Sequence, residues 1–168
     1  MGKRICMSLP EQGPGGRGGR STRALSLSRL MKLDGLSALD LGSHEGYNSL
    51  DLFESGCSRV VGVEIRDRFL EAAREEVRRL GYPGVEFVKA DARKIDEAGL
   101  GRFDLCLCTG LLYHMQNPFN LLKRIRNMCH VLALETHLAP TLWNLLRAER
   151  KYRCNLSWAT HRATLDGE

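Results

Sequence analysis

The chain has 168 residues, the length of one domain. Hydrophobic residues make up 43% and charged residues 27%, a globular mixture that excludes collagen-like and largely disordered proteins. No apolar run approaches the ~18 residues that span a bilayer. The Gly- and Arg-rich start has no apolar segment, so it does not resemble a secretory signal, and we expect no membrane partner.

The net charge of +5 is concentrated at the start of the chain. Residues 1–32 contain seven Lys or Arg and one acid, Glu11, whereas the remainder is nearly neutral. Residues 1–22 hold six glycines and two prolines and too little apolar surface to offset their ordering entropy, which predicts a disordered basic arm. Such an arm reaches toward nucleic acid or acidic surfaces, or it is a solvated leader, and we favour the second reading.

The cysteines contain no Cys-x-x-Cys pair. That spacing favours free thiols in a reducing compartment, the cytoplasm, over a disulfide framework or a zinc site. Cys106 and Cys108 share one face of an apolar run, which predicts core positions. The six are Cys6, Cys57, Cys106, Cys108, Cys129 and Cys154.

After a short predicted helix carrying Leu27, Leu30 and Met31, short apolar strands alternate with amphipathic helices. The clearest helix has a stripe of apolar residues from Phe69 to Leu80 and is stopped by Gly81. In chain order the pattern predicts a strand at 36–41, a helix at 47–55, a strand at 59–65, a helix at 68–80, strands at 85–89 and 103–108, a helix capped by Asn117 with Pro118 at its first position, a strand at 130–136 and a helix at 141–150.

This alternation predicts an α/β fold: a mostly parallel sheet covered by helices on both faces. In such sheets ligands bind beyond the carboxyl ends of the strands. Three polar features stand at those ends. They are the turn Asp40-Leu41-Gly42-Ser43-His44-Glu45-Gly46, the acid Glu64 and the acid Asp91. The glycines permit a sharp turn and a close ligand approach, and Glu64 could accept hydrogen bonds from ribose hydroxyls.

The runs ALDLGSHEG, VVGVEI, FVKADA and FDLCLCTGLLYH, within residues 36–138, resemble class I S-adenosylmethionine-dependent methyltransferases. The resemblance implies a three-layer Rossmann-like fold and S-adenosylmethionine as cofactor. It also implies that Gly42 to Gly46 hold the methionine part, Glu64 the ribose, and Ile65, Asp91 and Ala92 the adenine. The full set of implied cofactor residues is Asp40, Gly42, Ser43, His44, Gly46, Glu64, Ile65, Asp91, Ala92, Thr109, Gly110 and Leu111.

Two details refine the resemblance. His44 stands where the family usually has a glycine, which restricts the backbone of the turn. The later runs TGLLYH (109–114), Asn117-Pro118-Phe119 and LETH (134–137) look like the branch that transfers a carboxymethyl group to a tRNA wobble uridine, and its uncharacterised relatives. The large terminal additions of the tRNA enzymes are absent from this sequence, so the methyl acceptor is left as a small molecule or RNA.

His114 follows the fourth strand of the sheet and is the candidate catalytic base, because imidazole titrates near neutrality. The alternative is that it caps the next helix or lines the site. Glu135 and His137 share a face at the end of the fifth strand and, with His114, could hold a metal or orient a substrate. We favour a polar structural role for them and predict no metal site.

Residues 23–151 are predicted to form the cofactor-binding domain and residues 152–168 a weakly structured tail with at most one strand near 155–158. The antiparallel hairpin that usually ends the class I sheet is missing from the pattern. One alternative function is therefore a truncated, catalytically impaired cofactor-binding module. Another is a nicotinamide oxidoreductase, whose Gly-x-Gly-x-x-Gly fingerprint fails at His44.

Without that hairpin the strand at 130–136 becomes an open apolar edge. Open edges invite pairing with another chain, and two-fold pairing is the commonest closed arrangement. The tail could cover the edge, with Leu156 and Trp158 as anchors, but it is short and polar. The sequence thus predicts a homodimer, or aggregation, through this edge or the apolar face beside it.

Overall fold

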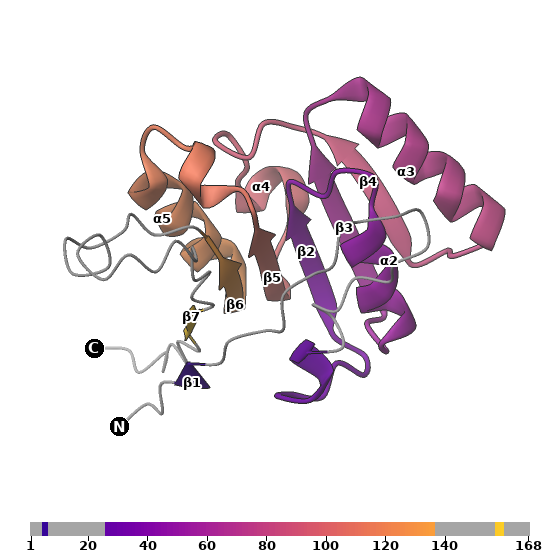
Figure 1. The fold of residues 1–168 in the computed structure, drawn as a ribbon, viewed down its shortest axis with the longest axis horizontal. Coiled ribbons are helices and arrows are strands. Elements are labelled where there is room, and N and C mark those ends of the chain that lie inside the picture. The colour runs from indigo at the N-terminus through magenta and orange to yellow at the C-terminus, as the bar shows by residue number, and fades with distance from the viewer. Residues whose placement is uncertain (1–4, 7–25, 137–156, 160–168) are drawn as a thin grey trace, which may run out of the picture.

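A computed structural model describes residues 5–6, 26–136 and 157–159 (Figure 1). Residues 26–28 form a helical turn at the start of the second stretch. The other elements are β1 (Ile5–Cys6), β2 (Ser37–Leu41), α2 (Tyr47–Glu54), β3 (Arg59–Glu64), α3 (Asp67–Leu80), β4 (Val85–Lys89), α4 (Glu97–Leu100), β5 (Phe103–Thr109), the 3-10 turn η1 (Leu112–His114), α5 (Pro118–Met128), β6 (Cys129–Glu135) and β7 (Ser157–Ala159).

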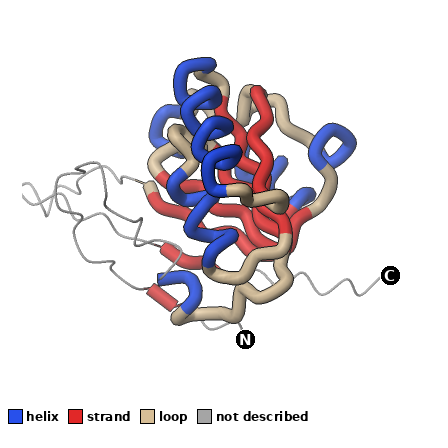
Figure 2. The backbone as a smooth tube through the Cα atoms, turned by 90° about the vertical axis from the view of Figure 1, so that its right-hand side faces the viewer, coloured by secondary structure: helices blue, strands red, loops and turns tan. Residues whose placement is uncertain are grey.

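The strands form one sheet in the order β1-β7-β6-β5-β2-β3-β4. The five strands from β6 to β4 are parallel, which confirms the predicted parallel α/β sheet and all five of its strands. β2 lies at the centre: Leu41 is in register with Val63 of β3 on one side and Cys108 of β5 on the other. Figure 2 shows the strands with helices on either side of them.

The prediction that the strand at 130–136 is an open edge is wrong over Leu132–Leu134, because β7 pairs with these residues in antiparallel orientation. β1 in turn pairs with β7, so a segment from the start of the chain lies where a hairpin strand would be expected. Ile5–Cys6 therefore depart from the predicted disordered arm. The remainder of the arm and of the tail lies outside the described residues. The homodimer stays a prediction, but the open edge on which it was based is already paired with β7 at Leu132–Leu134.

The predicted helices begin and end close to the predicted positions. α3 ends at Gly81, whose φ of 69° is left-handed, and the side chain of Asn117 caps α5 by accepting a hydrogen bond from the amide of Asn120 (3.2 Å). α4 and η1 were not predicted, since each is a single turn. The predicted helix at 141–150 lies outside the described residues. Within the described stretches, no helix has the length and apolar character needed to cross a membrane.

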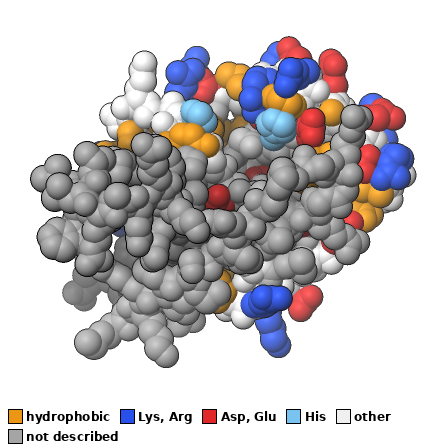
Figure 3. Space-filling model, in the orientation of Figure 1, with side chains coloured by type: hydrophobic (Ala, Val, Ile, Leu, Met, Phe, Trp, Pro, Cys, Tyr) orange, Lys and Arg blue, Asp and Glu red, His pale blue; other side chains and the backbone are white. Residues whose placement is uncertain are grey.

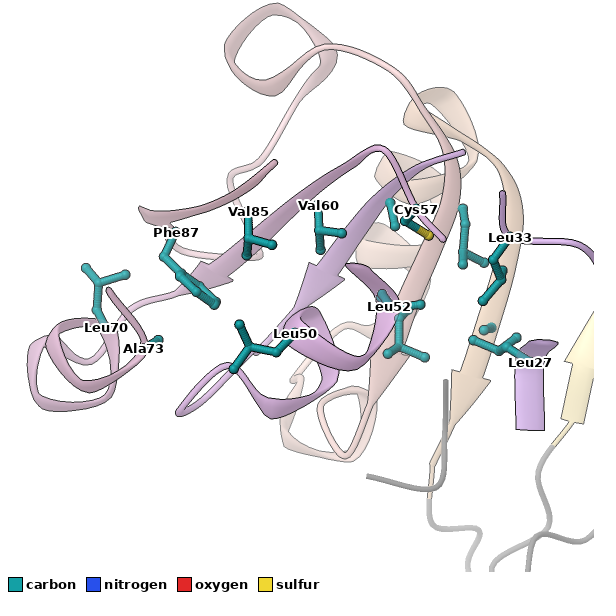
Figure 4. Packing of buried hydrophobic residues seen from close by; sticks show 14 residues of the cluster. Leu27, Leu33, Leu50, Leu52, Cys57, Val60, Leu70, Ala73, Val85 and Phe87 are labelled. Atoms are coloured by element: carbon teal, nitrogen blue, oxygen red, sulfur yellow. The ribbon is translucent and has the colours of Figure 1, made fainter. Parts of the chain in front are cut away.

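Each inner strand contributes to two cores, because successive side chains point to opposite faces of the sheet. Ala38, Val60 and Leu105 pack with residues of α2 and α3, whereas Leu39, Val61 and Cys106 pack with residues of α5. Figure 4 shows the first core, with Val60, Val85 and Phe87 of the sheet facing Leu50, Leu70 and Ala73 of the helices.

Phe87 fills the space above Gly62, which is its neighbour in the β3–β4 register. A Cβ atom on residue 62 would overlap the Phe87 ring and lie 3.0 Å from Ser43 Oγ. A Cβ on Gly46 would lie 2.5 Å from Phe87 Cζ. The aromatic ring thus connects the middle of the sheet with the turn after β2, and both glycines are needed for that contact.

We expect Gly62→Ala to lower the free energy of unfolding by about 1–3 kcal/mol, the usual cost of inserting a methyl group into a packed core. Gly99→Ala is the matched control: Gly99 is exposed on α4, and a Cβ there would only approach Asp96 Oδ1 at 3.3 Å. Urea denaturation measures both variants. Equal stability of Gly62→Ala and the wild type would contradict the described packing of Phe87.

Candidate functional site

The carboxyl ends of β2, β3, β4 and β5 meet at one edge of the sheet, as parallel pairing requires. Figure 3 shows histidine, basic and hydrophobic side chains gathered at the upper rim, the side toward which the strand arrowheads of β2, β3 and β5 point in Figure 1. The residues implied by the resemblance therefore come together, although they are spread over more than seventy positions in the sequence.

The turn after β2 is fastened to the next strand. The amides of Gly42 and Ser43 both donate to the carbonyl oxygen of Val63, at 2.9 and 3.0 Å. Gly42 has a φ of 74°, and a Cβ on it would lie 3.4 Å from Leu111 Cδ1. A glycine here gives the turn its left-handed conformation, and its bare Cα lets the loop after β5 approach.

His44 also has a positive φ, 54°, which is uncommon for a residue with a side chain and costs about 1–2 kcal/mol. Two contacts hold it there. Its amide donates to Glu64 Oε2 (3.1 Å), and its ring contacts that of Phe69 in α3, with centroids 3.5 Å apart and planes tilted by 33°. Burial and the nearby charge of Arg66 lower the pKa of the imidazole, so His44 is neutral at pH 7.

Glu64 is the buried anion of the site, with a side chain that is 2% exposed. Oε1 accepts from the amides of Ile65 and Arg66 and from Arg66 Nε, each at 2.9 Å. Oε2 accepts from the His44 amide and from an Arg66 guanidinium nitrogen, each at 3.1 Å. Burial alone would raise the pKa of Glu64, but the hydrogen bonds from Arg66 and His44 outweigh it and lower the pKa to about 2.

Asp91 repeats this arrangement at the end of β4. Its carboxylate accepts from the amide of Arg93 (2.9 Å) and from the Arg93 guanidinium (2.6 Å). The Arg93 side chain is the main cause that lowers the pKa of Asp91 to about 2. The Ala90 amide donates to the Glu64 carbonyl oxygen (3.3 Å), so Asp91, just after β4, lies at the same edge as Glu64 at the end of β3. Ala92 is half-buried beside Asp91.

Asp40 and Ser43 lie beneath the turn, at 1% and 3% exposure. Asp40 Oδ2 accepts from Ser49 Oγ (2.7 Å), which ties β2 to the start of α2. Ser43 Oγ points toward Gly62. The structure thus gives both residues a part in holding the turn in place, while direct contact of either with a cofactor stays a prediction.

The loop after β5 closes the other side of the turn. Thr109 Oγ1 accepts from Asn48 Nδ2 of α2 (3.3 Å), and the Gly110 amide donates to the Glu135 carbonyl oxygen (3.1 Å). Thr109, Gly110 and Leu111 are half-buried at this edge. On the opposite side Ile65, directly after Glu64, is 51% exposed and offers an accessible apolar side chain.

His114 lies in η1, further along the same loop, and is exposed. Its amide donates to the Leu111 carbonyl oxygen (3.0 Å), and its ring contacts that of Tyr113 at a centroid distance of 4.2 Å. Phe119 at the start of α5 is 73% exposed. The loop therefore presents an imidazole and aromatic surface on the Leu111 side of the turn, and a catalytic role for His114 stays a prediction.

Cys106 and Cys108 are fully buried core residues, as predicted. Burial raises the pKa of both thiols, to about 12 for Cys108, so neither is a nucleophile at neutral pH. Among the described residues, no three His, Cys, Asp or Glu side chains gather in a way that could hold a metal ion. His137 lies outside those residues.

Sequence reasoning missed the two arginines that hold the acids, Arg66 and Arg93. It also missed the contact of the Phe69 ring with that of His44. A signal for the arginines was present, because each stands two residues after its acid, in Glu-Ile-Arg and Asp-Ala-Arg. An arginine two residues after an acid at a strand end can form a local ion pair with it, and this spacing is visible in the sequence.

The chain is similar to several known proteins. A tRNA U34 carboxymethyltransferase of Shewanella putrefaciens is 31% identical over 105 residues, 60% of this chain and 31% of the relative. The crystal structure of EvdMO1 is 31% identical with a TM-score of 0.66, over 80% of this chain and 32% of EvdMO1. Coclaurine N-methyltransferase, crystallised with N-methylheliamine and SAH, is 31% identical with a TM-score of 0.58, over 66% of this chain and 34% of that enzyme.

The chain thus spans about a third of the length of these relatives. A family model described as a methyltransferase domain matches residues 32–156, most of the chain and all of the edge that carries the turn and the two acids. Because this family model matches most of the chain and the sheet is the parallel one expected for it, the chain belongs to the methyltransferase-domain family.

Proposed function

We propose that this protein binds S-adenosylmethionine and transfers its methyl group to a nucleophile on a small molecule or RNA. The observation that carries the proposal is the pair of ionised carboxylates, Glu64 and Asp91, at adjacent strand ends beside the left-handed turn at Gly42. Ribose hydroxyls and an adenine amine are the donors that two such acceptors suit.

The geometry of the edge fits an adenosyl group in three respects. The turn has a bare Cα at Gly42, the exposed side chain of Ile65 offers an apolar surface for a base, and the amino end of α2 follows the turn directly. Helix amino ends favour carboxylates such as that of the methionine part. The neutral His44 adds no charge beside the turn.

The bound cofactor supplies a methyl group on a sulfonium, which is activated for in-line displacement. The protein's part is to align the acceptor and exclude water. His114, exposed beside Tyr113, would remove the proton of an acceptor that has to lose one.

The acceptor is proposed to be a small molecule or an RNA. The similar proteins include a tRNA U34 carboxymethyltransferase, whose name indicates an RNA acceptor, and a coclaurine N-methyltransferase, whose name indicates a small-molecule acceptor. The exposed rings of Tyr113 and Phe119 suit a flat acceptor of either kind. We also propose a cytoplasmic location, because Cys57, Cys106 and Cys108 are buried free thiols.

Glu64→Gln should weaken binding of S-adenosylhomocysteine by about 1–3 kcal/mol, because the amide cannot accept from both ribose hydroxyls as the carboxylate does. Glu86→Gln is the control: Glu86 lies within β4, away from the edge, and accepts a hydrogen bond from Arg59 (3.1 Å). Calorimetric titration measures both. Unchanged affinity in Glu64→Gln would refute the ribose assignment.

His114→Ala should lower turnover by roughly 10²-fold or more if the acceptor must be deprotonated, with cofactor affinity unchanged. His130→Ala is the matched control, since His130 is an exposed histidine near the opposite end of the sheet, at the start of β6. Transfer of a tritiated methyl group to RNA and small-molecule pools gives turnover. A parallel fall in turnover and affinity would assign His114 to the cofactor shell, and binding without any transfer would favour the impaired module.

A further inference from the structure

The carboxylate of Glu64 has no acceptor capacity left for a ligand. A carboxylate offers about four lone-pair sites. Five N–H groups already occupy those of Glu64: three from the backbone of His44, Ile65 and Arg66, and two from the Arg66 guanidinium. Ribose hydroxyls would need the same oxygens.

Only the guanidinium can leave. The three amides belong to the turn and the end of β3, so they are fixed by the backbone. The Arg66 side chain, in contrast, is 55% exposed and extends from residue 66 over the Phe69 ring, with its guanidinium carbon 4.2 Å from the ring centroid. It can swing into solvent without moving any element of the fold.

We propose that Arg66 competes with the cofactor ribose for Glu64 and is displaced when the cofactor binds. This inference rests on the proposed function. In the free protein the guanidinium keeps the buried carboxylate satisfied, which an anion in that position requires. On binding, two ribose hydroxyls take over its two bonds. Arg66 is therefore a positioning residue that weakens cofactor affinity while it stabilises the ligand-free site.

Arg93 stands in the same relation to Asp91. Its guanidinium donates to both carboxylate oxygens while being 64% exposed, and the Asp91 side chain is 16% exposed. From the described residues Asp91 receives three N–H groups, all from Arg93, and is thus less fully occupied than Glu64. Arg93 competes with the adenine amine because its guanidinium spans both carboxylate oxygens. The two exchanges concern different parts of the ligand, which makes them separable by choice of ligand.

The experiment compares Arg66→Gln with Arg68→Gln. Arg68 is the matched control, because its guanidinium carbon also lies 4.2 Å from the Phe69 centroid and the substitution removes the same charge. The hydrogen bonds to Glu64, in contrast, come from His44, Ile65 and Arg66. Titration with S-adenosylhomocysteine, whose sulfur is uncharged, should show Arg66→Gln binding on the order of threefold to tenfold more tightly than wild type. Arg68→Gln should remain within about twofold of wild type.

A second arm uses adenosine and 2′,3′-dideoxyadenosine as competitors of S-adenosylhomocysteine. The gain in Arg66→Gln should appear with adenosine and vanish with the dideoxy compound, because a ligand without hydroxyls leaves Arg66 on Glu64. The gain in Arg93→Gln should persist with both. Thermal melting without ligand should show a lower Tm for Arg66→Gln than for Arg68→Gln, since only the former strips a donor pair from a buried acid.

Unchanged or weaker binding of S-adenosylhomocysteine by a folded Arg66→Gln would overturn the competition and show that Arg66 stays on Glu64 in the complex. An equal gain with the dideoxy compound would also overturn it, because the effect would then be one of charge alone. Failure of the wild type to bind S-adenosylhomocysteine at all would instead refute the proposed function.

Discussion

The carboxylate of Glu64 is an anion almost entirely removed from solvent, and a buried anion is costly unless donors surround it. The donors come from two places that are twenty residues apart: the end of β3 and the His44 amide in the turn after β2. Satisfying this one side chain therefore fixes the turn against the neighbouring strand. The left-handed backbone of His44, unfavourable by itself, is retained because its amide is one of those donors.

Under the proposed function the same residues would serve both a ligand-free and a ligand-bound site. Glu64 and Asp91 are each held by an arginine two positions later, and both acids stay ionised far below neutral pH. Without such a partner, each acid would be an unpaired charge, shielded from solvent, whenever no ligand is bound. In the proposed exchange the arginine has to move before a ligand reaches the acid, and the exposure of both guanidinium groups is compatible with that movement.

The support for this edge comes from the packing beneath it. Phe87 occupies the space above Gly62 and reaches Gly46, so one ring connects β4, β3 and the turn. It shares a core cluster with Ala73 of α3. At the far side of the sheet, β7 covers β6 and β1 covers β7. These short strands lie away from the carboxyl ends of β2, β3 and β4, so the site is built at the ends of the parallel strands β2, β3, β4 and β5.

The sequence by itself determined the five parallel strands, the long helices and the order of the turn and the two acids, because side-chain periodicity, caps and glycine stops are local signals. Tertiary structure alone decided the rest. The pairing of Ile5–Cys6 with residues near the other end of the chain is non-local, and no periodicity predicts it. The spacing of Arg66 two residues after Glu64 is visible in the sequence. The burial of that acid and its bond to the His44 amide, twenty residues away, become defined only when β2, β3 and α3 pack together.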